Sequence, residues 1–84
     1  MQFDLNRFLS VMLELYFECR QDGEDLTPKE MLANRPAVRM AVRRELWRQA
    51  KSQGANRRER RKFAAGNLDN AIANLEQEVD RLTH

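Results

Sequence analysis

The chain has 84 residues, of which 42% are hydrophobic and 33% are charged. This length fits one domain, and the balance of apolar and charged side chains excludes a disordered tail. The formal net charge is only +2, but residues 35–62 contain eleven basic and two acidic side chains, whereas the segments on either side are acidic. A positive field concentrated in this way implies an anionic partner: nucleic acid, an acidic protein or the acidic ends of this protein.

The first predicted element is an amphipathic helix over residues 3–20. Its apolar residues form one broad arc on a helical wheel: Leu5, Phe8, Leu9, Met12, Leu15, Tyr16 and Cys19, widened by Leu13 and Phe17. One partner helix covers a narrower stripe than this, so we expect the helix to lie centrally or to contribute to a dimer interface. Glu14 and Glu18 interrupt the apolar stretch, so the segment is predicted to be neither a signal peptide nor a membrane span.

The next two helices are predicted from their start signals. The spacing of Thr27 and Glu30 is that of a capping box, which predicts a short helix over residues 28–34. Pro36 disfavours helical geometry at the residue before it, so a separate third helix is expected over residues 36–53.

The last predicted helix covers residues 56–82 and follows a stop signal at Gly54. Asn56 and Glu59 have the spacing of a second capping box. Gly66 is the weak point of this helix, because glycine costs about 1 kcal/mol relative to alanine there. Five apolar residues are spaced 4-3-4-3, which is typical of a heptad seam, and they are predicted to mediate self-association: Leu68, Ile72, Leu75, Val79 and Leu82.

Together these elements predict an all-α fold. We expect a small bundle of about four helices, two long, one medium and one short, in a single domain over residues 1–84. A chain this small often gains stability by associating with a second copy, so a homodimer is expected.

Ten basic residues of the last two helices are the candidate site for nucleic acid or an acidic partner: Arg39, Arg43, Arg44, Arg48, Lys51, Arg57, Arg58, Arg60, Arg61 and Lys62. Five of them open the last helix, at the positive end of its dipole, where each exposed cation is disfavoured by about 0.3–1 kcal/mol. Arg57 and Arg61 are also a like-charge pair one helical turn apart. An external anion should therefore compensate them, and phosphate suits the planar, multi-donor side chain of arginine.

Trp47 lies between the basic residues of the third helix. An exposed tryptophan beside arginines can stack on an unpaired base, which contributes roughly 1–3 kcal/mol. A tryptophan in a small helical domain can equally pack in the core with arginine stems around it. The sequence leaves both interpretations open.

Three nucleic-acid-binding architectures can be compared with these residues. Ala50 and Gly54 have helix-turn-helix spacing, but Gln49 and Gln53 stand where that motif needs apolar packing residues. A basic-region zipper also has arginines before heptads, but only five seam residues follow here. The string RRERR resembles the arginine-rich motif of the lambdoid phage N antitermination proteins, which implies binding of an RNA hairpin by Arg57, Arg58, Arg60 and Arg61.

The charge pattern also has explanations without nucleic acid. Two copies of the last helix packed antiparallel would place Glu76, Glu78 and Asp80 of one against the arginines of the other. Alternatively, the arginines could be masked by the acidic segment of their own chain, Asp22, Glu24 and Asp25. A further alternative is a small regulator or inhibitor of the viral accessory type, which docks on a partner protein through its basic helix and the apolar face of its first helix.

No enzymatic activity is predicted. The one histidine is His84 and the one cysteine is Cys19, so no zinc-binding set is expected. No hydroxyl group has a histidine base for a nucleophilic triad, and no glycine-rich loop could hold a nucleotide phosphate. We therefore expect no cofactor, metal, small-molecule substrate or membrane association and, since the cysteine has no partner, a cytoplasmic location.

Overall fold

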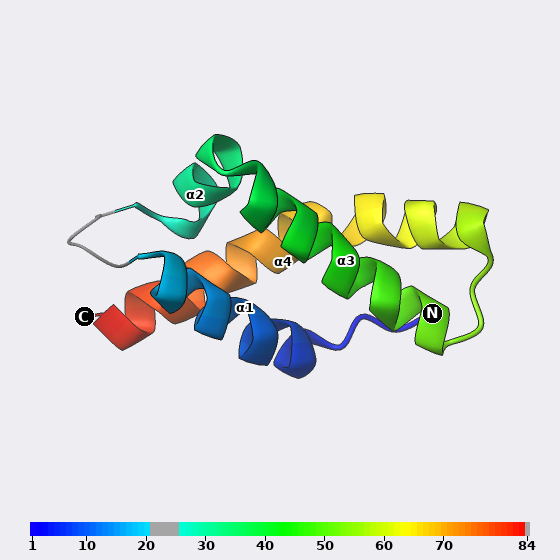
Figure 1. The fold of residues 1–84 in the computed structure, drawn as a ribbon. Coiled ribbons are helices and arrows are strands. Elements are labelled where there is room, and N and C mark those ends of the chain that lie inside the picture. The colour runs from blue at the N-terminus through cyan, green and yellow to red at the C-terminus, as the bar shows by residue number, and fades with distance from the viewer. Residues whose placement is uncertain (21–25, 84) are drawn as a thin grey trace.

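A computed structural model of the chain describes residues 1–20 and 26–83. Within these residues the chain forms four helices and no strand: α1 (Leu5–Cys19), α2 (Pro28–Asn34), α3 (Pro36–Ser52) and α4 (Arg57–Thr83). They pack into a globule with extents of 41 × 23 × 17 Å, which confirms the predicted all-α class. Figure 1 shows the amino-terminal segment beside the carboxyl end of α3, and α4 running back along the molecule toward α2.

Side chains cap α2 and α4 at the positions that the sequence predicts. The Thr27 hydroxyl accepts from the Glu30 N–H at 3.2 Å, and the Glu30 carboxylate accepts from the Thr27 N–H at 3.4 Å. Asn56 and Glu59 make the same reciprocal contacts, both at 2.9 Å. Both capping boxes are therefore confirmed. Gly54, which follows the end of α3, has a φ of +86°, as expected of a glycine that ends a helix.

The bounds of α1, α3 and α4 differ by one or two residues from those that the sequence predicts. α1 begins at Leu5 instead of residue 3, because Asp4 is its N-cap and accepts from the Arg7 N–H at 3.1 Å. α4 continues without interruption through Gly66. A Cβ added at Gly66 would meet nothing within 4 Å, so this glycine is not required for close packing among the described residues.

The core forms where α1 and α2 pack on α3 and α4. Helix α4 contacts the three other helices, and α1 also contacts α3. Phe8, Met31 and Leu46, from α1, α2 and α3 in turn, are completely buried. The broad apolar arc of α1 is covered except at its edge, where Phe17 is 40% exposed, and Val11, outside the arc, is 37% exposed.

The predicted heptad seam of α4 lies largely within this core. Ile72, Leu75 and Val79 are buried among residues of the same chain, Leu68 is half-buried, and Leu82 is 50% exposed. Packing inside one chain is therefore sufficient to explain the 4-3-4-3 spacing. A second copy would have to contact other parts of the surface, and the homodimer stays a prediction.

Candidate nucleic-acid interface

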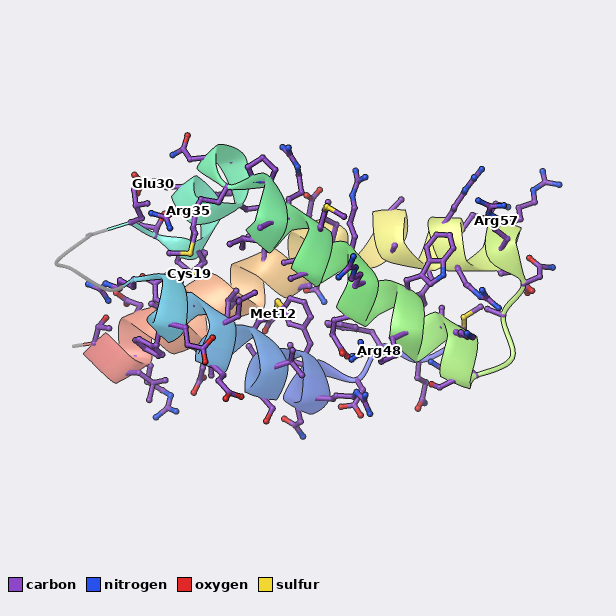
Figure 2. All side chains as sticks on the ribbon, viewed as in Figure 1. Met12, Cys19, Glu30, Arg35, Arg48 and Arg57 are labelled. Atoms are coloured by element: carbon purple, nitrogen blue, oxygen red, sulfur yellow. The ribbon has the colours of Figure 1, made fainter. Side chains whose placement is uncertain are left out.

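The predicted basic residues lie on α3 and on the first two turns of α4. Nine of the ten are exposed, and Arg60 is half-buried. The two helices are joined by a short turn, so the carboxyl half of α3 and the start of α4 lie at the same end of the molecule (Figure 1). In Figure 2, Arg57 projects from the start of α4 and Arg48 from the carboxyl half of α3.

Two of the ten already have partners within the chain, so we do not count them as part of the interface. The Arg48 guanidinium lies 3.6 Å from the Glu45 carboxylate, and Arg60 Nε donates to the Ala55 carbonyl at 2.8 Å. The other eight have no ion pair with any carboxylate in residues 1–20 or 26–83, and we call them the basic surface: Arg39, Arg43, Arg44, Lys51, Arg57, Arg58, Arg61 and Lys62.

A groove between α3 and α4 brings part of the basic surface together. It encloses about 550 Å³ and is lined by Arg43 and Trp47 from α3 and by Arg61, Ala64, Ala65, Leu68 and Asp69 from α4. A second hollow of about 380 Å³ lies along α3 and is lined by Met40, Arg43, Arg44 and Trp47. Trp47 is thus a wall of both hollows. We call the first of them the Trp47 groove.

Both interpretations of Trp47 from the sequence describe part of what the structure shows. The residue is half-buried, and the guanidinium carbon of Arg60 lies 6.0 Å from the centre of its ring, which is a cation–π distance. The ring nevertheless borders two hollows that are open to solvent. Trp47 is therefore supported by its neighbours and accessible to a ligand.

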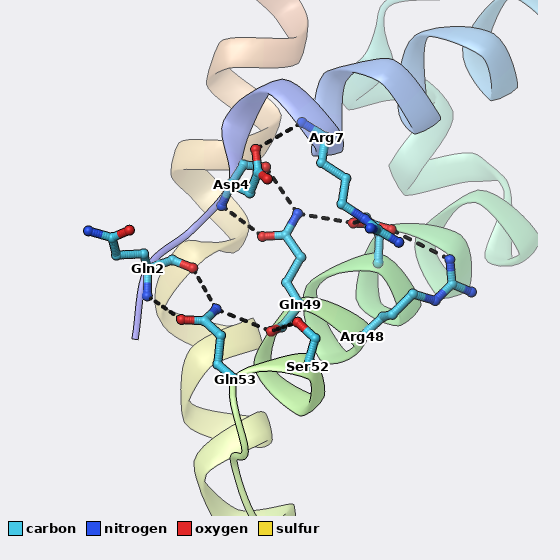
Figure 3. A network of polar contacts seen from close by, with 8 residues as sticks. Gln2, Asp4, Arg7, Arg48, Gln49, Ser52 and Gln53 are labelled. Carbon is cyan, nitrogen blue, oxygen red and sulfur yellow. Dashed lines mark hydrogen bonds and ion pairs between the residues drawn. The ribbon is translucent and has the colours of Figure 1, made fainter.

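Sequence reasoning missed a second polar region, at the start of the chain. Gln49 accepts from the Asp4 N–H at 2.8 Å and donates to the Asp4 carbonyl at 3.0 Å. Gln53 accepts from the Gln2 N–H at 2.8 Å and donates to the Gln2 carbonyl at 2.7 Å. Figure 3 shows both glutamines lying along the extended segment before α1. The spacing could have suggested this, because four residues on a helix rise about 6 Å, close to two residues of an extended chain.

A buried carboxylate completes this region. Glu45, with a side chain only 1% exposed, accepts from Arg7 Nε at 3.3 Å and from Gln49 Nε2 at 3.0 Å through one oxygen. The other oxygen lies near Arg48 but has no hydrogen-bond partner in the described part of the chain. We call Gln2, Asp4, Arg7, Glu45, Arg48, Gln49 and Gln53 the amino-terminal clamp.

Of the acidic residues proposed as partners of the arginines in a second copy, Glu76 and Glu78 have contacts within their own chain. Glu76 accepts from the Lys29 N–H at 2.7 Å. Glu78 pairs with Arg81, one turn along the same helix, and the hydrogen bond from Arg81 lowers the pKa of the Glu78 carboxyl below its ordinary value. The acidic residues of the segment 21–25 lie outside the described residues, as does His84.

Across residues 1–20 and 26–83, no three His, Cys, Asp or Glu side chains lie close enough to hold a metal ion. None of the helices described above has both the length and the apolar character needed to cross a membrane. Comparison with protein-family models, curated proteins and solved structures finds no match for this chain. The geometry of the basic surface and of the Trp47 groove is therefore the basis for inferring function.

Proposed function

We propose that this chain is a non-enzymatic nucleic-acid-binding protein with a regulatory role, and that it holds phosphates on the basic surface of α3 and α4. One observation carries the proposal. Eight exposed cations lie on two joined helices, and none has a carboxylate partner among the described residues. Like charges gathered in this way repel one another, and a polyanion relieves that repulsion.

The acidic residues within the basic segment support this proposal, because both have structural partners. Glu45 is buried in the amino-terminal clamp, and the Glu59 carboxylate accepts from the Asn56 N–H at the start of α4. Neither acid lines the Trp47 groove. Arginine also predominates over lysine in the basic surface, and its planar donors suit phosphate oxygens.

The experiment measures the affinity for a labelled RNA hairpin and a labelled DNA duplex as the salt concentration is raised. Neutralising phosphates releases counterions, so six phosphate contacts should lower the affinity about 10³-fold between about 50 and 200 mM salt. Replacing Arg57 and Arg61 by glutamine should weaken binding. It should also reduce the salt slope by about 0.9 for each duplex phosphate that the variant no longer neutralises.

A matched control separates local contacts from net charge. The double variant Lys29→Gln, Arg81→Gln lowers the net charge by the same two units on α2 and on the last turn of α4, outside the basic surface. It should change the affinity much less than Arg57→Gln, Arg61→Gln does. Equal effects of the two double variants, or binding that is absent or insensitive to salt, would contradict the proposal.

The exposed apolar residues of α1 favour a second candidate function, a regulator or inhibitor that binds a partner protein. Val11 and Phe17 leave part of this helix uncovered, and uncovered apolar faces are common at interfaces between proteins. Capture from a lysate treated with nuclease distinguishes the candidates. A stoichiometric protein that stays bound through nuclease and moderate salt, and is lost with Phe17→Ser, supports this second function.

A homodimer is a further part of the proposal. A chain of 9.9 kDa buries a smaller fraction of its surface than a larger domain does, and Leu82 is 50% exposed near the end of α4. Light scattering should then give twice the mass of one chain. A mass of one chain at all concentrations would contradict the homodimer and leave the nucleic-acid proposal unaffected.

A further inference from the structure

The Trp47 groove has a composition that phosphate binding alone does not require. Its α4 wall presents Ala64, Ala65 and Leu68, and its α3 wall presents the indole ring of Trp47. Apolar and aromatic surface of this kind does not attract phosphate. It does suit the face of a nucleobase, which stacks on aromatic rings whichever base it is.

The charged residues of the groove favour one orientation of the ligand. Arg43 and Arg61 line it from opposite helices, and Asp69 lines it one turn beyond Ala65 on α4. The two arginines attract phosphates, whereas the carboxylate of Asp69 repels them and can accept a hydrogen bond from an N–H group of a base. A base with its neighbouring phosphates at the arginines therefore satisfies all three side chains.

Arg60 supports the ring of Trp47 from outside the groove. Its Nε is held by the Ala55 carbonyl at 2.8 Å, and its guanidinium carbon lies 6.0 Å from the ring centre. Arg60 does not line the Trp47 groove. A ring held in this way loses little conformational entropy when a base stacks on it.

We propose that the Trp47 groove binds one unpaired nucleobase, stacked on Trp47, with the flanking phosphates on Arg43 and Arg61. This inference rests on the proposed function and deepens it, because it selects single-stranded or looped nucleic acid over a fully paired duplex. A paired base in a duplex has both faces covered by its neighbours and cannot reach the ring without being unstacked. RNA and DNA single strands share the required chemistry.

Trp47 itself reports on this contact, because it is the one tryptophan of the chain. Its fluorescence is followed while the protein is titrated with an oligouridine strand, an oligodeoxyuridine strand and a fully paired duplex of equal charge. We expect strong quenching by the single strands and little by the duplex. A difference between the two single strands would assign a contribution to the ribose 2′-hydroxyl.

Substitutions test the same contact without fluorescence from Trp47. Trp47→Ala should lower the affinity for single strands about ten- to hundredfold and leave the affinity for the duplex nearly unchanged, whereas Trp47→Phe should retain most of the single-strand affinity. Asp69→Asn keeps an acceptor oxygen for the base and removes the charge that repels phosphates, so it should raise the affinity for single strands. The control Lys62→Gln, outside the groove, should weaken both kinds of binding to the same extent.

The outcomes separate the inference from the function on which it rests. The inference is overturned if both single strands and duplex bind in a salt-sensitive way and Trp47→Ala weakens both kinds of binding equally, or weakens neither. The proposed function would then remain intact. No binding of any nucleic acid overturns both. If Trp47→Ala does not fold, as judged by circular dichroism, the quenching contrast between strands and duplex in the unaltered protein decides the matter alone.

Discussion

The amino-terminal clamp and the basic surface share helix α3, but their arginines have opposite environments. In the clamp, Arg7 and Arg48 approach the buried carboxylate of Glu45 at 3.3 and 3.6 Å. On the basic surface, the cations have no carboxylate partner within the part of the chain that the structure describes. Arg48 therefore belongs to the clamp, whereas the eight cations of the basic surface face solvent.

This difference predicts a clear separation of effects. Substitutions in the clamp should lower the free energy of unfolding and leave nucleic-acid affinity unchanged. Substitutions on the basic surface should lower affinity, and those at the start of α4 should leave stability unchanged or higher. A variant that changed both in the same direction would show that the two regions are coupled.

The largest stability effect should come from Gln49→Ala, in the clamp. The substitution removes three hydrogen bonds, two with the Asp4 backbone and one with Glu45. At about 1 kcal/mol each, their loss should lower the free energy of unfolding by about 2–3 kcal/mol. Urea denaturation followed by circular dichroism measures this.

The matched control is Gln77→Ala, on the exposed face of α4. It should change stability by no more than about 0.5 kcal/mol. If Gln49→Ala were as mild as this control, the extended segment would not be held on α3 in solution.

The next largest effects on stability should come from replacing Gly54 and Gly66, one at a time, by alanine. Gly54→Ala should lower stability by about 1–2 kcal/mol, because φ is +86° there and a Cβ is disfavoured in left-handed backbone. Gly66→Ala should raise stability by about 0.5–1 kcal/mol, since the position is helical and a Cβ would meet nothing within 4 Å. Thermal unfolding of the two variants tests the opposite signs.

Nucleic-acid affinity should also distinguish these two glycines. Gly54 lies in the turn that joins α3 to α4, so it sets how the two halves of the basic surface meet. Gly66→Ala should leave affinity unchanged. Reduced affinity in this more stable variant would show that the ligand approaches the backbone at Gly66.

Local signals were enough to predict the helices, because capping acts over three residues. The Thr27–Glu30 and Asn56–Glu59 pairs needed no knowledge of the fold. The clamp could not be predicted in the same way, since Asp4 and Gln49 are 45 positions apart in the sequence. A glutamine on the buried side of a helix shows that a polar partner exists but does not identify it.

The partners of the heptad seam of α4 and the accessibility of the Trp47 groove could not be predicted from the sequence for a different reason. The spacing of Ile72, Leu75 and Val79 is the same whether their partner helix belongs to this chain or to another, and the structure buries them within the chain. Trp47 lies at the boundary between the buried and exposed faces of α3. Its accessibility depends on where α4 passes, which only the fold determines.

A smaller effect, of opposite sign to that of Gln49→Ala, should come from the start of α4. Replacing Arg57 or Arg58 by glutamine removes a cation from the positive end of the helix dipole, so each variant should gain about 0.3–1 kcal/mol of stability. Each should also bind nucleic acid more weakly. Thermal unfolding at low salt, paired with an affinity measurement, tests both parts.

Lys51→Gln is the control for the sign of this effect. Lys51 lies in the last turn of α3, where a cation is favourable, so its removal should lower stability by about 0.3 kcal/mol or slightly more. A gain in stability from Lys51→Gln would mean that general repulsion among the cations, and not the helix dipole, governs the stability of this region.

The smallest effect on stability should come from breaking the ion pair between Glu78 and Arg81. These two side chains are paired, as in the clamp, but they lie where water reaches them, as on the basic surface. Arg81 lowers the pKa of Glu78 from its ordinary value of 4.5, so the pair stabilises the fold at neutral pH, and this contribution is lost as the pH falls through the lowered pKa. Titration of the Glu78 carboxyl by nuclear magnetic resonance should show its pKa rising toward 4.5 in Arg81→Gln. Because water screens a pair on one exposed helix turn, the urea midpoint at neutral pH should hardly move. A large shift of that midpoint would mean that this ion pair stabilises the fold despite its exposure to water, and that burial is not the main difference between it and the clamp.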